Sequence, residues 1–428
     1  MLTAKDFLIP TLGTPKLDSP LTKSAFVSDD ERVLYHTDVN EVLCEAKDPD
    51  KLLSFEKAGA RKRIFHDPAR SRAAILTAGG LCPGLNEVIK SLTIMLINRY
   101  GVGSVYGIPY GYRGLNPANG MLPIPLTAET VDAIHESGGT ILGSSRGGEP
   151  TPVLVDSLVG LGINMLFCIG GDGTARGAHD IAQEIIKRKL PISVIAIPKT
   201  VDNDISFIDQ SFGFSTAVRT AGSFISGAHN EAKGAYNGIG LIKVMGRDSG
   251  FIAAFSSLAN PYVNYCLIPE EKFTLREGEH ALLPHLEDRL AKKHHAVIMV
   301  AEGAGQEFFT DAPERRDASG NKLHNDIGTF LKGEIIAYFK ERGIEINLKY
   351  FDPGYTIRSV QAEGEDSVFC SLLAQSAVHA AMSGRTDMMV GHWAGEFTHV
   401  PIPLTTSSRK KVDLEGPLWN GVKTLLCF

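Results

Sequence analysis

The run Asn164-Met-Leu-Phe-Cys-Ile169, which leads into Gly170-Gly-Asp-Gly-Thr174, decides the predicted fold. A second apolar run, Ile192-Ser-Val-Ile-Ala-Ile197, leads into Pro198-Lys-Thr-Val-Asp-Asn-Asp204. Short apolar runs that end in a glycine or proline turn are typical of strands buried inside a parallel sheet. Ligands of open α/β sheets bind beyond the carboxyl ends of such strands. We therefore expect the two turns to bring carboxylates, a lysine, a threonine and bare backbone to one crevice.

The strand, turn and helix pattern recurs from Arg72 onward. A strand over 73–77 runs into the glycine-rich turn 79–86, and an amphipathic helix is expected to begin at Glu87. Further strands are expected at 105–108, 239–244, 296–300 and 388–393. Strands that alternate with helices form βαβ units and mostly parallel sheets, so the predicted class is α/β.

Composition limits the possible partners. The chain has 428 residues, enough for two large domains or three small ones, and its 43% hydrophobic and 21% charged residues are ordinary for a globular protein. A formal charge of -6 does not favour a nucleic-acid partner, because the phosphate backbone attracts a basic face. The six cysteines are scattered without a CxxC pair, which indicates reduced thiols. No window resembles a signal peptide or membrane span, so we expect a cytoplasmic protein with no membrane partner.

The turn that contains Asp172 has the composition of a phosphate and metal site. Its glycines let the backbone approach an anion closely, and Asp172 offers oxygen to Mg2+. The next helix, expected to start at Thr174 or shortly after, adds unpaired N–H donors. The alternative for Asp172 is a simple helix N-cap. For the earlier turn 79–84, a tight strand-to-helix connection explains the glycines equally well.

The pair Asp202 and Asp204 is typical of proton-transfer chemistry. A kinase that acts on an alcohol needs a carboxylate within hydrogen-bond reach of the hydroxyl proton. A surface Asx-turn is the competing interpretation, although the preceding buried strand argues against it. Arg247 follows another apolar strand and could neutralise charge on a phosphoryl group, whereas an isolated arginine there would be a solvated strand end. Together these residues predict phosphoryl transfer.

Several ordered motifs resemble the 6-phosphofructokinase family, from about Ala73 to about Arg358. They are Gly79-Gly-Leu-Cys-Pro-Gly-Leu-Asn86, Gly143-Ser-Ser-Arg146, Gly170-Gly-Asp-Gly-Thr174, Pro198-Lys-Thr-Val-Asp-Asn-Asp204, Met245-Gly-Arg247 and Glu302-Gly303. Gly-Gly-Asp-Gly-Thr alone also occurs in NAD and diacylglycerol kinases, but a kinase of that kind leaves Asp202, Asp204 and Arg247 unexplained. A non-enzymatic regulatory subunit would be expected to have lost part of this set.

The resemblance implies two Rossmann-like lobes with mostly parallel sheets and an N-terminal extension. We expect the extension at 1–72, where prolines and charges are frequent, and it would pack on a core domain or a neighbouring subunit. Residues 73–210 would form the nucleotide or phosphoryl-donor lobe, and 211–390 the sugar-phosphate lobe. The segment 391–428 would pack back on the core. Family members are commonly allosteric homo-oligomers, so we expect a tetramer or a dimer.

The resemblance also implies roles for individual residues. Asp202 would deprotonate the 1-hydroxyl of fructose 6-phosphate, assisted by Lys199, Thr200 and Arg247, and Asp172 would hold Mg2+. The ATP contacts would be Gly80, Arg146, Gly171, Asp172, Gly173 and Thr174. The sugar-phosphate contacts would be Thr200, Asp202, Asp204, Met245, Gly246, Arg247, Glu302, Tyr355 and Arg358.

Two positions bear on the phosphoryl donor. Glycine at 173 resembles the ATP enzymes, because a carboxylate there would fill the space of the α-phosphate and repel it. Lysine at 199 resembles the pyrophosphate enzymes, although a lysine can contact the transferred phosphate in either case. The combination occurs in the branch that includes trypanosomatid and plant enzymes, which Lys243 and Asp248-Ser-Gly250 also resemble. Gly238 and Tyr355 depart from the bacterial pattern, so bacterial effector residues are not carried over. We expect ATP, with pyrophosphate as the alternative.

Overall fold

The computed structural model describes residues 2–48, 51–279, 281–309, 315–316 and 322–426. The chain divides into two compact units. Unit 1 contains residues 1–200, 205–213 and 360–408, and unit 2 contains residues 201–204, 214–359 and 409–428. None of the helices in these described ranges is long and apolar enough to cross a membrane.

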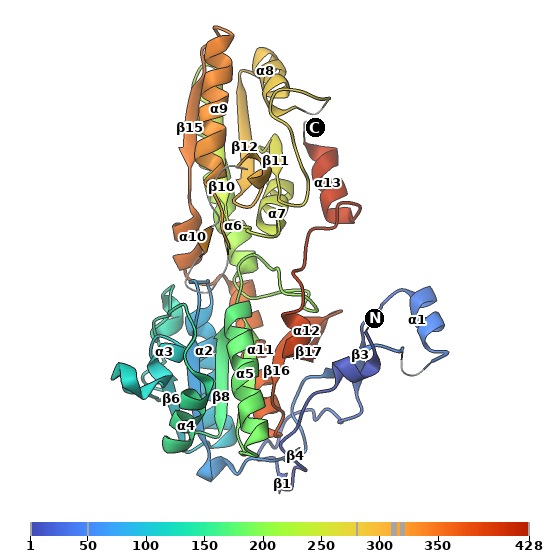
Figure 1. Ribbon diagram of the computed structural model, residues 1–428, viewed down its shortest axis with the longest axis vertical. Helices are drawn as coiled ribbons and strands as arrows, with labels where there is room; N and C mark the ends of the chain where they lie inside the picture. Colours follow the sequence, from blue (N-terminus) through green and yellow to red (C-terminus); the bar gives the residue numbers. More distant parts are fainter. Residues whose placement is uncertain (1, 49–50, 280, 310–314, 317–321, 427–428) are drawn as a thin grey trace. The chain divides into compact units, whose positions relative to one another are not determined.

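Unit 1 is built on a nine-stranded sheet (Figure 1). Its strands are, in spatial order, β2 (Arg32–Leu34), β3 (Ser54–Lys57), β17 (Glu396–Pro401), β16 (Met388–Trp393), β9 (Ser193–Pro198), β8 (Met165–Gly170), β5 (Arg72–Thr77), β6 (Ser104–Ile108) and β7 (Ile124–Leu126). The five strands from β16 to β6 are parallel, whereas the pairs at both edges are antiparallel. A buried parallel centre explains why the central strands are mostly apolar.

Helices cover both faces of this sheet. Side chains alternate along β9, so that Val194 and Ala196 join the core beneath α5, while the Ser193 hydroxyl donates to the Ala381 carbonyl of α11 at 3.1 Å. The helices of unit 1 are α1 (Val39–Glu45), α2 (Leu85–Ile94), η3 (Met95–Tyr100), α3 (Tyr112–Leu115), α4 (Thr151–Gly160), α5 (Asp172–Lys187), α11 (Gly364–Met382) and α12 (Ile402–Thr405). Single 3-10 turns are η1 (Ala4–Phe7), η2 (Pro68–Arg70), η4 (Pro117–Asn119) and η5 (Ile134–Glu136).

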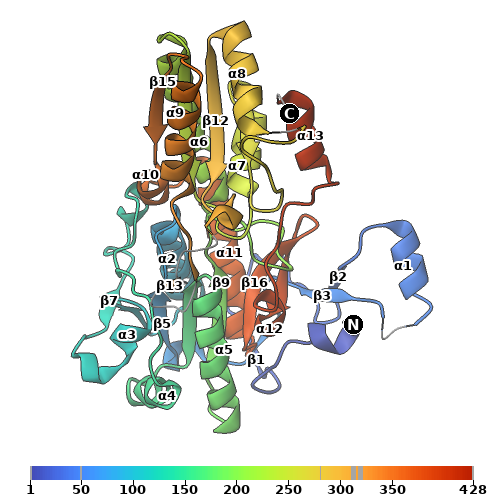
Figure 2. The same ribbon diagram turned by 45° about the horizontal axis from the view of Figure 1, so that its top comes forward.

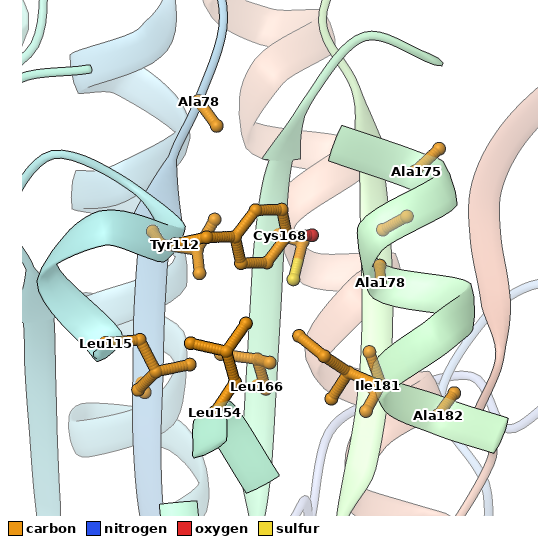
Figure 3. Packing of buried hydrophobic residues seen from close by; sticks show 14 of the residues in the cluster. Ala78, Tyr112, Leu115, Leu154, Leu166, Cys168, Ala175, Ala178, Ile181 and Ala182 are labelled. Carbon is orange, nitrogen blue, oxygen red and sulfur yellow. The ribbon is translucent and has the colours of Figure 1, made fainter. Parts of the chain in front are cut away.

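The core beneath α5 also supports the start of that helix. Figure 3 shows the Tyr112 ring pointing from α3 toward Cys168 of β8, with Ala175 and Ala178 of α5 nearby. The Tyr112 hydroxyl donates to the Thr174 carbonyl at 2.6 Å. This packing fixes the first turn of α5 against the sheet.

The N-terminal segment is an integral part of unit 1. Figure 2 shows β2, β3 and α1 (blue) at one edge of the unit, where β3 pairs with β17. Phe7 and Phe55 are buried in an aromatic cluster with Tyr35, and the two strands β1 (Leu17–Asp18) and β4 (Arg63–Ile64) form a separate small sheet. Buried Glu56 accepts hydrogen bonds from Arg61 and Arg385 and contacts His399.

Unit 2 contains a four-stranded parallel sheet in the order β11 (Tyr265–Leu267), β12 (His295–Ala301), β10 (Gly238–Val244) and β15 (Asn347–Phe351). Its helices are α6 (Phe214–Lys233), α7 (Phe251–Ala259), α8 (Leu282–Lys293), α9 (Ile327–Glu341), α10 (Gly354–Ser359) and α13 (Pro417–Leu425). The core lies between the sheet and helices α8 and α9, and α13 packs on α7. A 3-10 turn, η6 (Gln306–Phe308), and a short pair, β13 (Arg315–Arg316) with β14 (Lys322–Leu323), complete the unit.

The α/β class with mostly parallel sheets is confirmed, and each strand expected from an apolar run is present. The compact units do not follow the expected boundaries, because residues 360–408 return to unit 1 and supply its strands β16 and β17. The functional assignment of the lobes stays a prediction.

Candidate active site

In unit 1 the glycine-rich turns lie where the strand order reverses. Strands β5 and β8 are parallel neighbours, but the chain continues from β5 to β6 on one side and from β8 to β9 on the other. The carboxyl ends of two such strands leave a crevice between the diverging connections. The turn 79–84 follows β5, and the turn 170–174 follows β8.

Hydrogen bonds bring four segments of unit 1 together at this crevice. The Lys199 ammonium donates to the Gly80 carbonyl at 2.6 Å, and the Lys199 amide donates to the Gly170 carbonyl at 3.0 Å. The Gly79 amide donates to the Ser145 carbonyl at 3.0 Å, and the Ser144 hydroxyl donates to the Gly79 carbonyl at 2.6 Å. Gly79 has φ +88°, and a Cβ there would stand 3.2 Å from the Lys199 Nζ. The structure thus brings together the predicted site segments that contain Gly80, Lys199 and Arg146.

Asp172 is not the helix N-cap. Helix α5 begins at Asp172, two residues earlier than expected, and its N-cap is Gly171. The carboxylate is buried in the first turn, 3.9 Å from the Arg176 guanidinium, where the positive end of the helix dipole favours negative charge.

The other residues of this turn have contrasting environments. Gly173 is exposed, and a Cβ there would meet no heavy atom within 4 Å. Thr174 is buried against Gly170, where a Cβ would stand 2.1 Å from its hydroxyl oxygen. Glycine is therefore required at 170, whereas the space beside 173 is open.

A metal at this turn would have few protein ligands. In the part of the chain that the structure describes, no group of three or more His, Cys, Asp or Glu side chains is arranged to hold a metal ion. Asp172 supplies one buried carboxylate, and it lies at a glycine-rich turn of the kind that binds phosphate. This donor set fits a magnesium ion that arrives with phosphate ligands, because Mg2+ is usually held by one or two carboxylates plus substrate phosphates.

In unit 2 the predicted substrate residues beyond Asp204 follow the neighbouring strands β12, β10 and β15. The Glu302 amide donates to the Val244 carbonyl at 2.9 Å, which places the end of β12 beside the loop 245–250. Gly303 is required here, because its Cβ would stand 1.9 Å from the Arg247 carbonyl oxygen. Gly246 has φ +123°, a conformation that favours glycine.

The carboxylates of unit 2 influence one another. Burial, followed by the charges of Asp204 and Glu302, raises the pKa of Asp202 well above its usual range, while Arg409 and Arg247 act in the opposite direction. Burial also raises the pKa of Glu302, against the charges of Arg247, Lys243 and Arg358. A carboxyl group with a raised pKa accepts a proton more readily, as a general base requires.

Tyr355 and Arg358 lie together on α10. The Tyr355 side chain is 82% exposed, and the Arg358 guanidinium lies 4.9 Å from the centre of its ring. The Arg358 Nε donates to the Gly354 carbonyl at 3.3 Å, and a Cβ on Gly354 would lie 3.6 Å from the Met245 sulfur. This places α10 next to the loop after β10.

The contacts of two cations at this site were not expected from the sequence. Lys243 contacts Asp326 at 3.1 Å and Asp352 at 2.9 Å, and so ties α9 to the loop that leads into α10. The Arg409 guanidinium lies 2.5 Å from Asp204. A charged position inside an apolar strand was a signal for Lys243, whereas Arg409 lies in a basic run that resembles a solvated surface.

The chain was compared with known proteins. Residues 72–381 match the model of a family described as Phosphofructokinase. The chain is 47% identical, over 97% of its length and 95% of the relative, to an ATP-dependent 6-phosphofructokinase of Borreliella burgdorferi. It is 44% identical to ATP-dependent 6-phosphofructokinase 7 of Arabidopsis thaliana, over 96% of this chain and 84% of that protein.

Solved structures share the fold at lower identity. A pyrophosphate-dependent phosphofructokinase of Marinobacter aquaeolei superposes with a TM-score of 0.67 at 19% identity, over 83% of this chain and 91% of that chain. A phosphofructokinase of Saccharomyces cerevisiae gives a TM-score of 0.62 at 21% identity, over 83% of this chain and 46% of that chain. The matched family model, the close relatives and the shared fold agree that this chain belongs to the phosphofructokinase family.

Proposed function

We propose that the protein transfers the terminal phosphoryl group of ATP to the 1-hydroxyl of fructose 6-phosphate, giving fructose 1,6-bisphosphate and ADP, as in glycolysis. The proposal rests chiefly on the segment 199–204. One end holds Lys199 against the Gly80 carbonyl, and the other places Asp202 beside Asp204 and near the charges of Glu302 and Arg247. Because Lys199 and Asp202 are only three positions apart in the sequence, they would supply a cation for the transferred phosphate and a carboxylate for the accepting hydroxyl.

In the proposed reaction the sugar hydroxyl oxygen forms a bond to the γ-phosphorus, and the bond from that phosphorus to the ADP oxygen breaks. Asp202 accepts the hydroxyl proton as the new bond forms. The cations Lys199 and Arg247 balance the negative charge of the transferred group, which is the main contribution that a protein makes to phosphoryl transfer. Thr200 would line the same centre.

The nucleotide would bind along the glycine-rich turns of unit 1, through Gly80, Arg146, Gly171, Gly173 and Thr174. Asp172 would hold Mg2+, which shields the phosphate charges when it is bound with the nucleotide. The sugar phosphate would contact Asp204, Met245, Gly246, Glu302, Tyr355 and Arg358. Arginine provides paired donors suited to a phosphate, so Arg358 is the candidate for the 6-phosphate.

The open space beside Gly173 favours ATP over pyrophosphate, because the α-phosphate needs room at this turn. The relatives at 44–47% identity are named ATP-dependent enzymes, whereas the pyrophosphate-dependent enzyme of Marinobacter aquaeolei is 19% identical. Pyrophosphate-dependent transfer to the same hydroxyl is the second candidate, supported by Lys199. We also propose that the protein is cytoplasmic and forms a homo-oligomer, either a tetramer or a dimer. Light scattering of the purified protein tests the oligomeric state.

The decisive experiment measures turnover of fructose 6-phosphate with Mg2+ and either ATP or pyrophosphate. We expect activity with ATP, and a decrease in kcat of roughly a hundredfold to ten-thousandfold in Asp202→Asn. Asp180→Asn, which changes an exposed carboxylate on α5, is the control and should keep full activity. Activity with pyrophosphate alone would overturn the donor, full activity of Asp202→Asn would overturn the base, and inactivity with both donors would overturn the function.

A further inference from the structure

The segment Arg409–Val412 lies against the loop that carries the proposed base. The Arg409 guanidinium is 2.5 Å from the Asp204 carboxylate, whose side chain is only 4% exposed. The Lys410 amide donates to the Asp204 carbonyl at 2.9 Å. Side chain and backbone of this basic segment thus contact the same residue, two positions after Asp202.

The same segment is also held to the loop that carries Arg247. The carboxylate of Glu270 accepts from the Val412 amide at 2.8 Å and from the Gly250 amide at 3.0 Å. The Lys410 ammonium lies 5.3 Å from the ring centre of Phe251. Glu270 therefore links the basic segment to the loop 245–250, so both loops of the site in unit 2 are fixed by one stretch of chain.

The charges around Asp202 require compensation. Three carboxylates contribute there, from Asp202 and Asp204 in one loop and from Glu302 at the end of β12. Arg247 after β10 and Arg409 are the cations that favour ionised Asp202, and Arg409 also lies 4.0 Å from Asp248. The Asp204 side chain is buried whereas that of Arg409 is 31% exposed, so removal of Arg409 would leave a buried carboxylate without this compensating charge, which is unfavourable.

We propose that Arg409 is a positioning residue of the phosphoryl transfer: by pairing with Asp204 it fixes the loop of Asp202 and neutralises the carboxylate beside the base. The inference rests on the proposed function, because it assigns Asp202 the proton transfer. Arg409 acts through Asp204 and not through the substrate. Its loss should therefore affect kcat and the pH dependence of the rate more than KM.

The test compares Arg409→Met, Arg409→Lys and Lys411→Met in the full chain with ATP, fructose 6-phosphate and Mg2+. Arg409→Met should lower kcat on the order of tenfold or more, and move the acidic limb of the pH profile of kcat/KM to higher pH. The reason is that Asp202 would lose its proton less readily beside an uncompensated Asp204. Arg409→Lys keeps the charge and should restore most of the rate and the position of the limb.

Lys411→Met is the matched control, since it removes one positive charge from an exposed position of the same segment. It should leave both quantities unchanged. An unshifted limb and an unchanged kcat in Arg409→Met, in a wild-type protein that is active, would overturn this inference alone. An inactive wild type would overturn the proposed function and this inference with it. If Arg409→Met does not fold, Arg409→Lys alone decides. A kcat and an acidic limb equal to those of the wild type would support the requirement for a positive charge. An acidic limb shifted to higher pH would contradict it.

Discussion

Gly173 lies at the turn where we propose that the phosphoryl donor binds. It lies in the first turn of α5, exposed, with no heavy atom within 4 Å of a Cβ placed there. A larger side chain can therefore be introduced without disturbing the fold. Any effect of such a substitution would report on what binds beside the turn.

We expect Gly173→Asp to abolish activity with ATP. The added carboxylate would occupy the space proposed for the α-phosphate and repel it, while the melting temperature should remain close to that of the wild type. Gly173→Ala adds a methyl group without charge and should retain most of the activity. The measurement is kcat/KM for ATP in the three proteins. ATP activity at the wild-type level in Gly173→Asp would contradict the proposed donor site.

At the scale of elements, a buried cluster of charged side chains joins β3 to the rest of unit 1. Glu56 lies 3.0 Å from Arg61 and 3.1 Å from His399, and it also accepts from Arg385. Burial alone would raise the pKa of Glu56, but the hydrogen bond and charge of His399 and the charges of Arg385 and Arg61 lower it to about 2. The folded state therefore favours the ionised carboxylate.

This cluster predicts a specific loss of stability in acid. The contribution of Glu56 is complete above the ordinary pKa of 4.5 and is lost as the pH falls toward about 2. Glu56→Gln should lower the free energy of unfolding at pH 7 by roughly 3 kcal/mol and flatten its dependence on pH in that window. Urea unfolding at several pH values measures both effects.

The control for this prediction is Glu396→Gln, which breaks the more exposed contact with Lys57 at 3.0 Å. Because ion pairs near the surface contribute little, the expected change is below about 1 kcal/mol. An acid dependence in Glu56→Gln as steep as that of the wild type would assign the acid sensitivity to other carboxylates.

The elements that the sequence predicts well are those whose burial is complete. Strands β8 and β9 are buried along their whole length, and apart from Ser193 they are apolar, because helices cover both of their faces. Strand β15, Asn347–Phe351, alternates exposed and partly buried residues at a sheet edge, and β7 has three residues, so neither has an apolar run to reveal it. The start of α5 at Asp172 was missed because glycines at its N-terminus resemble a loop.

The residues of the candidate site likewise differ in how well the sequence predicts them. Asp172, Asp202 and Arg247 could be proposed from the sequence because each follows a buried strand that ends in a distinctive turn. Arg409 lies 205 positions after its partner Asp204, and nothing in its local sequence indicates that contact. A pairing that depends on the path of the whole chain has no local pattern from which it could be predicted.

At the scale of the whole molecule, the N-terminal segment is expected to be indispensable. Removal of residues 1–57 deletes β2 and β3, exposes the edge of β17 and removes Phe7 and Phe55 from the aromatic cluster. Because an uncovered strand edge promotes aggregation, the truncated protein should be insoluble or aggregated. Size-exclusion chromatography tests this, with removal of residues 1–3 as the control. A soluble, active truncated protein would show that the segment is dispensable.

The return of residues 360–408 to unit 1 has a consequence for biosynthesis. Strand β3 ends at Lys57, but its partner β17 begins only at Glu396, so the two cannot pair until most of the polypeptide has left the ribosome. At translation rates of about 5 to 20 residues per second, that interval is roughly 17 to 70 s. During this time β3 carries Phe55 without its final neighbour. A nascent chain of this protein thus presents an incomplete sheet edge to chaperones for nearly the whole of its synthesis.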